Sequence, residues 1–225
     1  APVANANPAS SSSASGMGSI SPWVYVGGGT LALGAAAGGG GGGGGAASAV
    51  STIAGIVLDG YIANATVFRD ANGNGVLDDD EARVQTDANG RFSGLEGSGD
   101  IIALGDDDSV DIATDLPFSG TLRAPSGASV VTPLTTLLEA SGEQNIDEAQ
   151  ANVRASLGLD PDIDLLTTNP LDADNPNAEL LVAGIKVASL SSMAKAAGAD
   201  DDQTLANLYQ QMRDATNSGT TLSNE

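Results

Sequence analysis

One short stretch of this sequence carries oxygen-bearing side chains at a recognisable spacing. It reads Asp70-Ala71-Asn72-Gly73-Asn74-Gly75-Val76-Leu77-Asp78-Asp79-Asp80-Glu81. A hard cation such as Ca²⁺ takes about six to eight oxygen ligands, and a twelve-residue binding loop supplies them from its positions 1, 3, 5, 7, 9 and 12. The residues at those positions are Asp70, Asn72, Asn74, Val76, Asp78 and Glu81, with Val76 offering its carbonyl oxygen. The spacing therefore predicts a calcium site.

The segments on both sides of this loop favour strands over helices. Thr66-Val67-Phe68 precedes the loop and Arg83-Val84-Gln85 follows it, and both contain residues that are typical of strands. We therefore predict the loop without the flanking helices that open in calmodulin-like sensors. Because several ligands are neutral, the expected affinity is weak, ~10⁻⁴–10⁻³ M, as in extracellular modules. A solvated acidic turn without an ion is the alternative interpretation.

A second acidic cluster consists of Asp106-Asp107-Asp108 and Asp111. Its carboxylates have the chemistry to hold another ion, but their spacing matches no ligand template. A solvated loop is therefore the preferred interpretation, and a second ion is the alternative.

Several residue types that support catalysis are missing from the sequence. The chain contains no histidine and no cysteine, which removes the commonest catalytic base and all thiolate ligands. Catalysis would then need paired carboxylates or an activated serine or lysine, and no nucleophile motif is present. We therefore do not expect an enzyme.

Charge is distributed unevenly along the chain. The 29 acidic residues outnumber the 8 basic ones, the net charge is −21, and the first charged residue is Asp59. This excess argues against nucleic acid as a partner, because phosphates are bound by clusters of Lys and Arg. It also makes contact with anionic membranes unexpected and favours divalent cations.

The uncharged N-terminal segment, residues 1–49, is rich in Ser, Ala and Gly. It contains Trp23-Val24-Tyr25-Val26, then Leu31 and Leu33, and an unbroken glycine run over 38–45. Alternation would place both aromatic residues on one face of an extended strand, so we predict an assembly strand that pairs with another subunit. A flexible tether is the second interpretation. Membrane contact is the third, although the apolar stretch is shorter than the ~20 residues of a spanning helix.

Residues 50–131 are predicted to form short strands joined by turns. The expected strands are 53–58, 65–69, 82–86, 91–93, 101–104, 121–123 and 129–131. Asp87-Ala88-Asn89-Gly90 is an expected turn in which Gly90 takes a positive φ. Residues 132–225 favour helices, expected over 132–140, 147–157, 177–197 and 201–217. The predicted fold class is α+β, with an antiparallel β-sandwich followed by a small helical region packed on it and preceded by the extended Gly-rich segment.

Two of the expected helices carry specific signals. Thr132-Pro133-Leu134 predicts a helix start with a capping threonine and a proline at the first helical position. In the helix over 177–197, a wide apolar stripe predicts a packed face. This stripe consists of Leu180, Leu181, Ile185, Val187, Ala188 and Met193.

Part of the sequence resembles a known family. Asp59-Gly60-Tyr61-Ile62-Ala63-Asn64-Ala65-Thr66-Val67-Phe68, the loop that follows it, and Thr86-Asp87-Ala88-Asn89-Gly90-Arg91-Phe92 resemble an SdrD B-like, carboxypeptidase-regulatory-like domain of bacterial surface proteins. This resemblance covers roughly residues 50–131 and implies an Ig-like β-sandwich with calcium at the loop. The stretch from Trp23 through the polyglycine and the stretch 131–138 are similar to secreted adhesins and biofilm-matrix proteins of Gram-negative bacteria.

Two functional hypotheses follow from these observations. The chain begins Ala-Pro-Val, which we interpret as a mature end left by signal-peptide removal, so an extracellular or cell-surface location is expected. The first hypothesis is a calcium-stabilised structural subunit of an extracellular filament or matrix. In it, the N-terminal segment inserts into a neighbouring copy as a donated strand and builds a head-to-tail homopolymer. The second is a calcium-dependent surface adhesin or binding module with that segment as a flexible tether.

Overall fold

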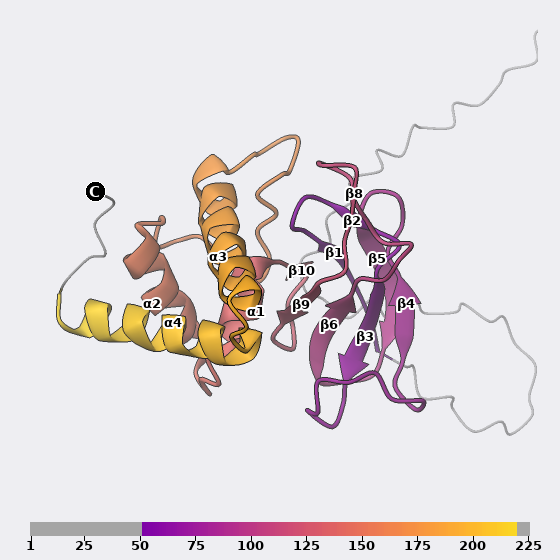
Figure 1. Ribbon diagram of the computed structural model, residues 1–225, viewed down its shortest axis with the longest axis horizontal. Helices are drawn as coiled ribbons and strands as arrows, with labels where there is room; N and C mark the ends of the chain where they lie inside the picture. The colour runs from indigo at the N-terminus through magenta and orange to yellow at the C-terminus, as the bar shows by residue number, and fades with distance from the viewer. Residues whose placement is uncertain (1–50, 220–225) are drawn as a thin grey trace, which may run out of the picture.

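The chain combines a region of strands with an adjoining region of helices (Figure 1). The computed structural model describes residues 51–219, so the predictions for residues 1–49 lie outside the described residues. The strands are β1 (Thr52–Val57), β2 (Ile62–Ala63), β3 (Thr66–Asp70), β4 (Arg83–Gln85), β5 (Arg91–Glu96), β6 (Asp100–Leu104), β7 (Val110–Asp111), β8 (Leu116–Pro117), β9 (Thr121–Ala124) and β10 (Val130–Val131). The helices are α1 (Pro133–Ala140), α2 (Ile146–Leu157), α3 (Ala178–Ala196) and α4 (Asp201–Asn217). The predicted mixed α+β content is confirmed.

Two of the sheets share one apolar core. One has the strand order β10-β1-β5, and the other has the order β4-β3-β6-β9. Both sheets contribute side chains to this core, among them Val57, Phe92, Val67, Ile101 and Leu122. Because alternate side chains of a strand point to opposite faces, each strand presents one buried row to the other sheet. The signal from which most of the strands could be predicted is the short run of strand-forming residues between turns.

Two features of the sheets differ from the sequence-based expectation. A small third sheet, with the order β2-β7-β8, was not predicted; its strands have two residues each, too few to show alternation. In addition, β1 and β10 run parallel, with Ile56 opposite Val130, so the expectation of antiparallel pairing is wrong for this pair. A parallel pair requires a long connection, and a local pattern cannot reveal such a pairing.

Helix α1 connects the sheets to the other helices. Its N-terminus has the predicted cap: the Thr132 hydroxyl accepts from the Thr135 N–H at 3.1 Å, and Pro133 lies in the first turn. The Thr135 hydroxyl donates to the carbonyl of Arg123 in β9 at 2.7 Å. The Thr136 hydroxyl accepts from the N–H of the same Arg123 at 2.9 Å. The first turn of α1 therefore satisfies backbone groups at an edge of the sheet.

A second apolar core lies among the four helices. Leu137 of α1, Val153 of α2, Val187 of α3 and Tyr209 of α4 all contribute to it. Leu166, in the segment between α2 and α3, packs against both this core and the core between the sheets. The sheets and helices are thus joined through apolar contacts as well as through the first turn of α1.

Helix α3 departs from the prediction that its wide stripe would be packed. Of that stripe, Leu180 and Val187 are buried, whereas Ile185 and Met193 are 52% and 68% exposed. The prediction failed because the sequence shows that a helix is apolar but not how many neighbours it has. Within residues 51–219, no helix combines the length and the apolar character needed to cross a membrane.

Replacing Thr135 by Val should weaken the junction between α1 and β9. The side chain is fully buried, and the change keeps its shape while leaving the Thr132 N–H without its hydroxyl partner and the Arg123 carbonyl with only the longer 3.3 Å bond from the Thr136 hydroxyl. A buried polar group left unpaired costs about 1–3 kcal/mol, so urea denaturation should show the free energy of unfolding lowered by about that amount. Thr121→Val, at an exposed position of β9, is the control, and an equal loss in both variants would contradict this account.

Candidate metal centre

The twelve-residue loop joins the end of β3 to the start of β4, at the rim of the four-stranded sheet (Figure 1). Asp70, its first residue, is the last residue of β3, and Glu81, its last, lies just before Arg83 of β4. β3 and β4 pair with Phe68 opposite Arg83, so the hydrogen-bonded strands hold the two ends of the loop close together. The sheet thus fixes both terminal carboxylates of the predicted ligand set.

Asp70 organises the first half of the loop. One of its carboxylate oxygens accepts from the N–H groups of Gly73 and Asn74 at 2.8 and 3.1 Å, and the other accepts from Gly75 N–H at 2.8 Å. The residue is only 7% exposed. Three backbone donors therefore fix the carboxylate, and they turn the backbone of the loop around it.

Glu81 closes the loop from the opposite end. Its two carboxylate oxygens accept from the N–H of Ala71 at 2.8 Å and from the N–H of Asp78 at 3.1 Å. The residue is 8% exposed, so the carboxylate is turned inward instead of reaching into solvent. Both of its oxygens face the loop, as expected for a bidentate ligand.

The side chains of Asn72, Asn74 and Asp78, three of the predicted ligands, are hydrogen-bonded to one another. The side-chain amides of Asn72 and Asn74 both donate to the same oxygen of Asp78, at 2.7 and 2.8 Å. Their own carbonyl oxygens accept from the N–H groups of Asn74 and Val76. Since a carbonyl oxygen has two lone pairs, each has one left for a cation. The structure therefore brings Asn72, Asn74 and Asp78 together.

The donor set fits a hard cation, although the acidic residues do not form a ready-made cluster. Within residues 51–219, no three His, Cys, Asp or Glu side chains are gathered as a metal site. The loop instead combines three carboxylates with two amides and the Val76 carbonyl, all of them oxygen ligands that calcium prefers. The Val76 side chain is 59% exposed, consistent with a residue that would contribute only its backbone.

Arg123 is a contact of the loop that the sequence did not indicate. A methyl group added at Gly75, whose φ is +73°, would lie 3.4 Å from the Arg123 guanidinium. The same guanidinium is 3.7 Å from Glu139 of α1 and 3.2 Å from Asp202 of α4. Position 6 of the loop thus lies near a side chain that also reaches two helices. Arg123 simply follows the alternation of β9, so no sequence pattern marks this role.

The second acidic cluster caps turns. Asp106 accepts from the Asp108 N–H and the Ser109 hydroxyl, at 3.0 and 2.9 Å. Asp111 accepts from the Ala113 N–H and the Thr114 hydroxyl, at 2.8 and 2.9 Å. These bonds are typical of aspartates in turns. They show that Asp106 and Asp111 each stabilise a turn, and a second ion at this cluster stays the alternative prediction.

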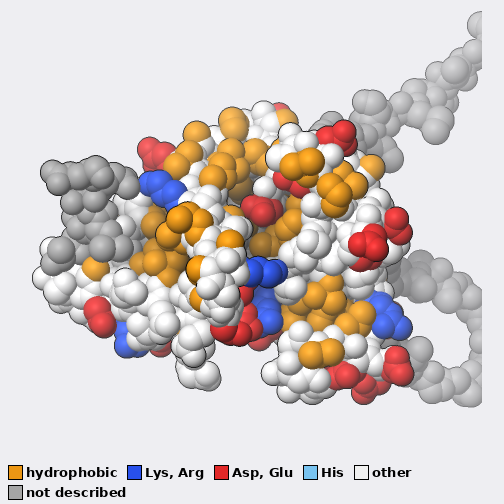
Figure 2. All heavy atoms as spheres, in the orientation of Figure 1, with side chains coloured by type: hydrophobic (Ala, Val, Ile, Leu, Met, Phe, Trp, Pro, Cys, Tyr) orange, Lys and Arg blue, Asp and Glu red, His pale blue; other side chains and the backbone are white. Residues whose placement is uncertain are grey.

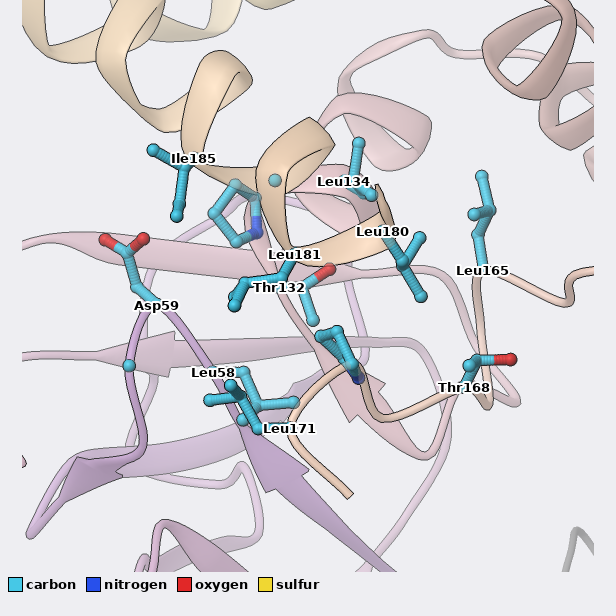
Figure 3. A pocket seen from close by; sticks show the side chains of 14 residues that line it. Leu58, Asp59, Thr132, Leu134, Leu165, Thr168, Leu171, Leu180, Leu181 and Ile185 are labelled. Atoms are coloured by element: carbon cyan, nitrogen blue, oxygen red, sulfur yellow. The ribbon is translucent and has the colours of Figure 1, made fainter. Parts of the chain in front are cut away.

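Asp59 stands at the rim of an apolar hollow between β1 and α3 (Figure 3). Leu58, Leu171, Leu181 and Ile185 are among the residues that line the hollow, and the Asp59 carboxylate points toward the side on which Ile185 lies. Partial burial of the carboxylate, with a smaller repulsion from Asp111, raises the pKa of Asp59 to about 6. Asp59 therefore titrates nearer to neutrality than an ordinary aspartate.

Calcium should raise the stability of the protein through the loop. With a dissociation constant of ~10⁻⁴–10⁻³ M, about 10 mM Ca²⁺ would add about 1.4–2.7 kcal/mol to the free energy of unfolding. Glu81→Gln should weaken calcium binding by about tenfold or more, the range seen even for outer partners of a metal. Isothermal titration calorimetry and urea denaturation measure both effects.

Asp80→Asn provides the matched control for that variant. It removes the same charge from the same loop, but Asp80 is exposed and is not at a ligand position. Its calcium affinity should stay close to that of the unmodified chain. Equal weakening of calcium binding in both variants would mean that the affinity depends only on the overall charge of the loop.

Asp59→Asn should stabilise the protein at neutral pH and lose this advantage in acid. The folded-state pKa of Asp59 is about 6, above the unfolded value of about 3.9, so the folded protein binds the proton more tightly. The ionised carboxylate therefore destabilises the fold above pH 6, and protonation removes this penalty as the pH falls toward 4. Urea denaturation should show that the variant exceeds the unmodified chain in free energy of unfolding by less at pH 4.5 than at pH 7.5. An equal difference at both pH values would contradict the raised pKa.

Comparison with known proteins identifies no relative. No protein-family model matches the chain, no curated protein matches it, and no solved structure matches it. The resemblance of residues 50–131 to SdrD B-like domains therefore stays a prediction, and function has to be inferred from the loop and the surfaces of the protein.

Proposed function

We propose that this protein is a calcium-stabilised structural subunit of a secreted bacterial filament or matrix, joined to its neighbours through the uncharged N-terminal segment. The observation that carries the proposal is the organisation of the loop. Asp70 and Glu81 are buried, tied to backbone N–H groups and placed at opposite ends of an oxygen-lined turn. Such a site suits a structural ion, because it is closed by backbone contacts and contains no histidine or cysteine.

The finer fold proposed is an Ig-like β-sandwich. Support comes from the core shared by the sheets β10-β1-β5 and β4-β3-β6-β9. In a chain without cysteine, no disulfide can brace such a sandwich, so calcium at the β3–β4 loop would take that role. Binding there would also act on the helices, because Arg123 contacts both the loop and the ion partners on α1 and α4.

The acidic character of residues 59–225 supports joining through the uncharged segment. All of the net charge of −21 lies in this part of the chain, so two copies repel each other when their folded regions approach. The segment before Asp59 carries no charge and can approach a neighbour without that repulsion. The proposed partner is therefore another copy of the chain, in a head-to-tail homopolymer outside the cell.

Deleting residues 1–50 should abolish assembly without unfolding the remaining chain. Negative-stain electron microscopy of the full-length protein in calcium should show filaments, whereas the truncated protein should show single particles. Circular dichroism should confirm that the truncated protein stays folded, because both apolar cores lie within residues 51–219.

Calcium removal gives the second arm of the same experiment. In chelator, the full-length protein should lose filaments or form less stable ones, since the loop carboxylates then repel one another. Filaments from the truncated protein would disprove joining through the segment. Single particles under every condition would favour the alternative function, a calcium-dependent adhesin with the segment as its tether.

A further inference from the structure

Helix α3 carries a concentration of exposed apolar side chains. Of the seven large hydrophobic residues exposed within residues 51–219, four lie on this helix. They are Val182, Ile185, Leu190 and Met193, and each is between 48% and 68% exposed. Figure 2 shows hydrophobic side chains gathered on the surface in this region. Contiguous apolar patches on a surface mark interaction sites.

A hollow borders this face of α3 on each side. One is the apolar hollow of Figure 3, which Leu181 and Ile185 share with Leu58, just after β1. The other measures about 370 Å³ and lies between Val182 of α3 and Leu159, just after α2. The hollow of Figure 3 is small, about 30 Å³, so an extended chain laid across α3 would place a large side chain in the second hollow and lie over the rim of the first.

We propose that this face of α3 is the docking site for the apolar part of the N-terminal segment, residues 23–33, of a second copy. The inference rests on the proposed function and names the surface that receives the joining segment. The occupant has the required chemistry: it holds Trp23, Tyr25, Leu31 and Leu33 and carries no charge. It can therefore cover an apolar face without bringing carboxylates to it.

The charge on α3 is small and positive. The helix contains Glu179, Lys186 and Lys195, a net charge of +1 from two lysines and one glutamate. These are the only lysines of a chain whose net charge is −21. Because a net positive helix also attracts carboxylates, this charge does not select the occupant, and the exposed apolar side chains of α3 carry the choice of the uncharged segment.

The sheet edges, in contrast, are mostly blocked against an added strand. Backbone groups at the edge of β9 are bonded to Thr135 and Thr136. At the edge of β10, the N–H groups of Ser129 and Val130 both donate to the Leu166 carbonyl. Edges that are already bonded cannot take another strand.

The two remaining edges carry features that discourage pairing. β4 has three residues, and its two ends, Arg83 and Gln85, are exposed. β5 pairs with β1 through a bulge between Ile53 and Gly55, and Gly94 in β5 has a φ of +72°. Charge, shortness and bulges are the usual protections of an edge strand, so neither of these edges of the two larger sheets favours an added strand.

The chain is long enough for this contact. Residues 34–50 separate Leu33 from the first described residue, and a fully extended chain covers about 3.3–3.6 Å per residue. The segment can therefore reach almost 60 Å, well beyond the radius of gyration of about 15 Å expected for a domain of this size. That reach allows docking on a neighbouring copy.

Tryptophan fluorescence of the full-length chain tests the proposal, because Trp23 is the only tryptophan. As protein concentration rises, its emission should move to shorter wavelength while filaments appear in electron micrographs. The double variant Ile185→Ser, Met193→Ser should keep the emission of exposed tryptophan and stay monomeric. The control Ile112→Ser, Leu116→Ser changes two similarly exposed residues away from α3 and should assemble normally.

The outcomes separate the docking site from the proposed function. If the α3 variant assembles and shifts its emission like the unmodified chain, the docking site is wrong while the filament function stands. Short-wavelength emission at every concentration would place the segment on its own α3 and overturn docking between copies. An unmodified chain that neither assembles nor shifts would overturn both.

Disulfide trapping tests the contact directly, since the natural chain has no cysteine. A Tyr25→Cys protein mixed with a Val182→Cys protein should form a mixed disulfide dimer under mild oxidation. Mixing it with a Ser93→Cys protein, which places the thiol at an exposed position of β5, should give much less. Preferential trapping by the Ser93→Cys protein would show strand addition at β5 and overturn docking on α3.

Discussion

The architecture depends on how the first turn of α1 meets the edge of β9. Two threonine hydroxyls, from Thr135 and Thr136, satisfy the carbonyl and the N–H of Arg123. An edge strand with unpaired backbone groups would attract another chain, and a helix start leaves N–H groups that need partners. Residues 132–136 cap the start of α1 and also bond the backbone of Arg123 at the edge of β9. The same residues attach the helical core to the sheet.

Arg123 links this junction to the loop at the rim of the sheet. Its backbone is bonded to α1, while its guanidinium lies against Gly75 and near Glu139 and Asp202. Burial raises the pKa of Glu139, and the charge of Arg123 opposes this shift. The loop is therefore physically connected to both α1 and α4. An ion that orders the loop would consequently also stabilise the contact between the sheet and the helices.

The local structure of the chain could largely be predicted from the sequence. Gly90 has a φ of +72°, and Asp87 accepts from the N–H groups of Asn89 and Arg91, as a turn at 87–90 requires. The helix start at Thr132 could be predicted in the same way, and so could the tight turn of the loop from Asp70 to Glu81. All of these features arise from contacts between residues close in the chain, so residue type and spacing carry the information.

Only the tertiary structure decided which surfaces are covered. The α3 stripe is apolar in sequence, but the exposure of Ile185 and Met193 depends on how many elements pack around the helix. The contact of Arg123 with Gly75 joins residues far apart in the chain, and so does the parallel pairing of β1 with β10. The sequence by itself determined the loop, the strands and the helices, because their hydrogen bonds and periodicities are local. Which edges are blocked and which face stays open follows from long-range packing, which no local pattern records.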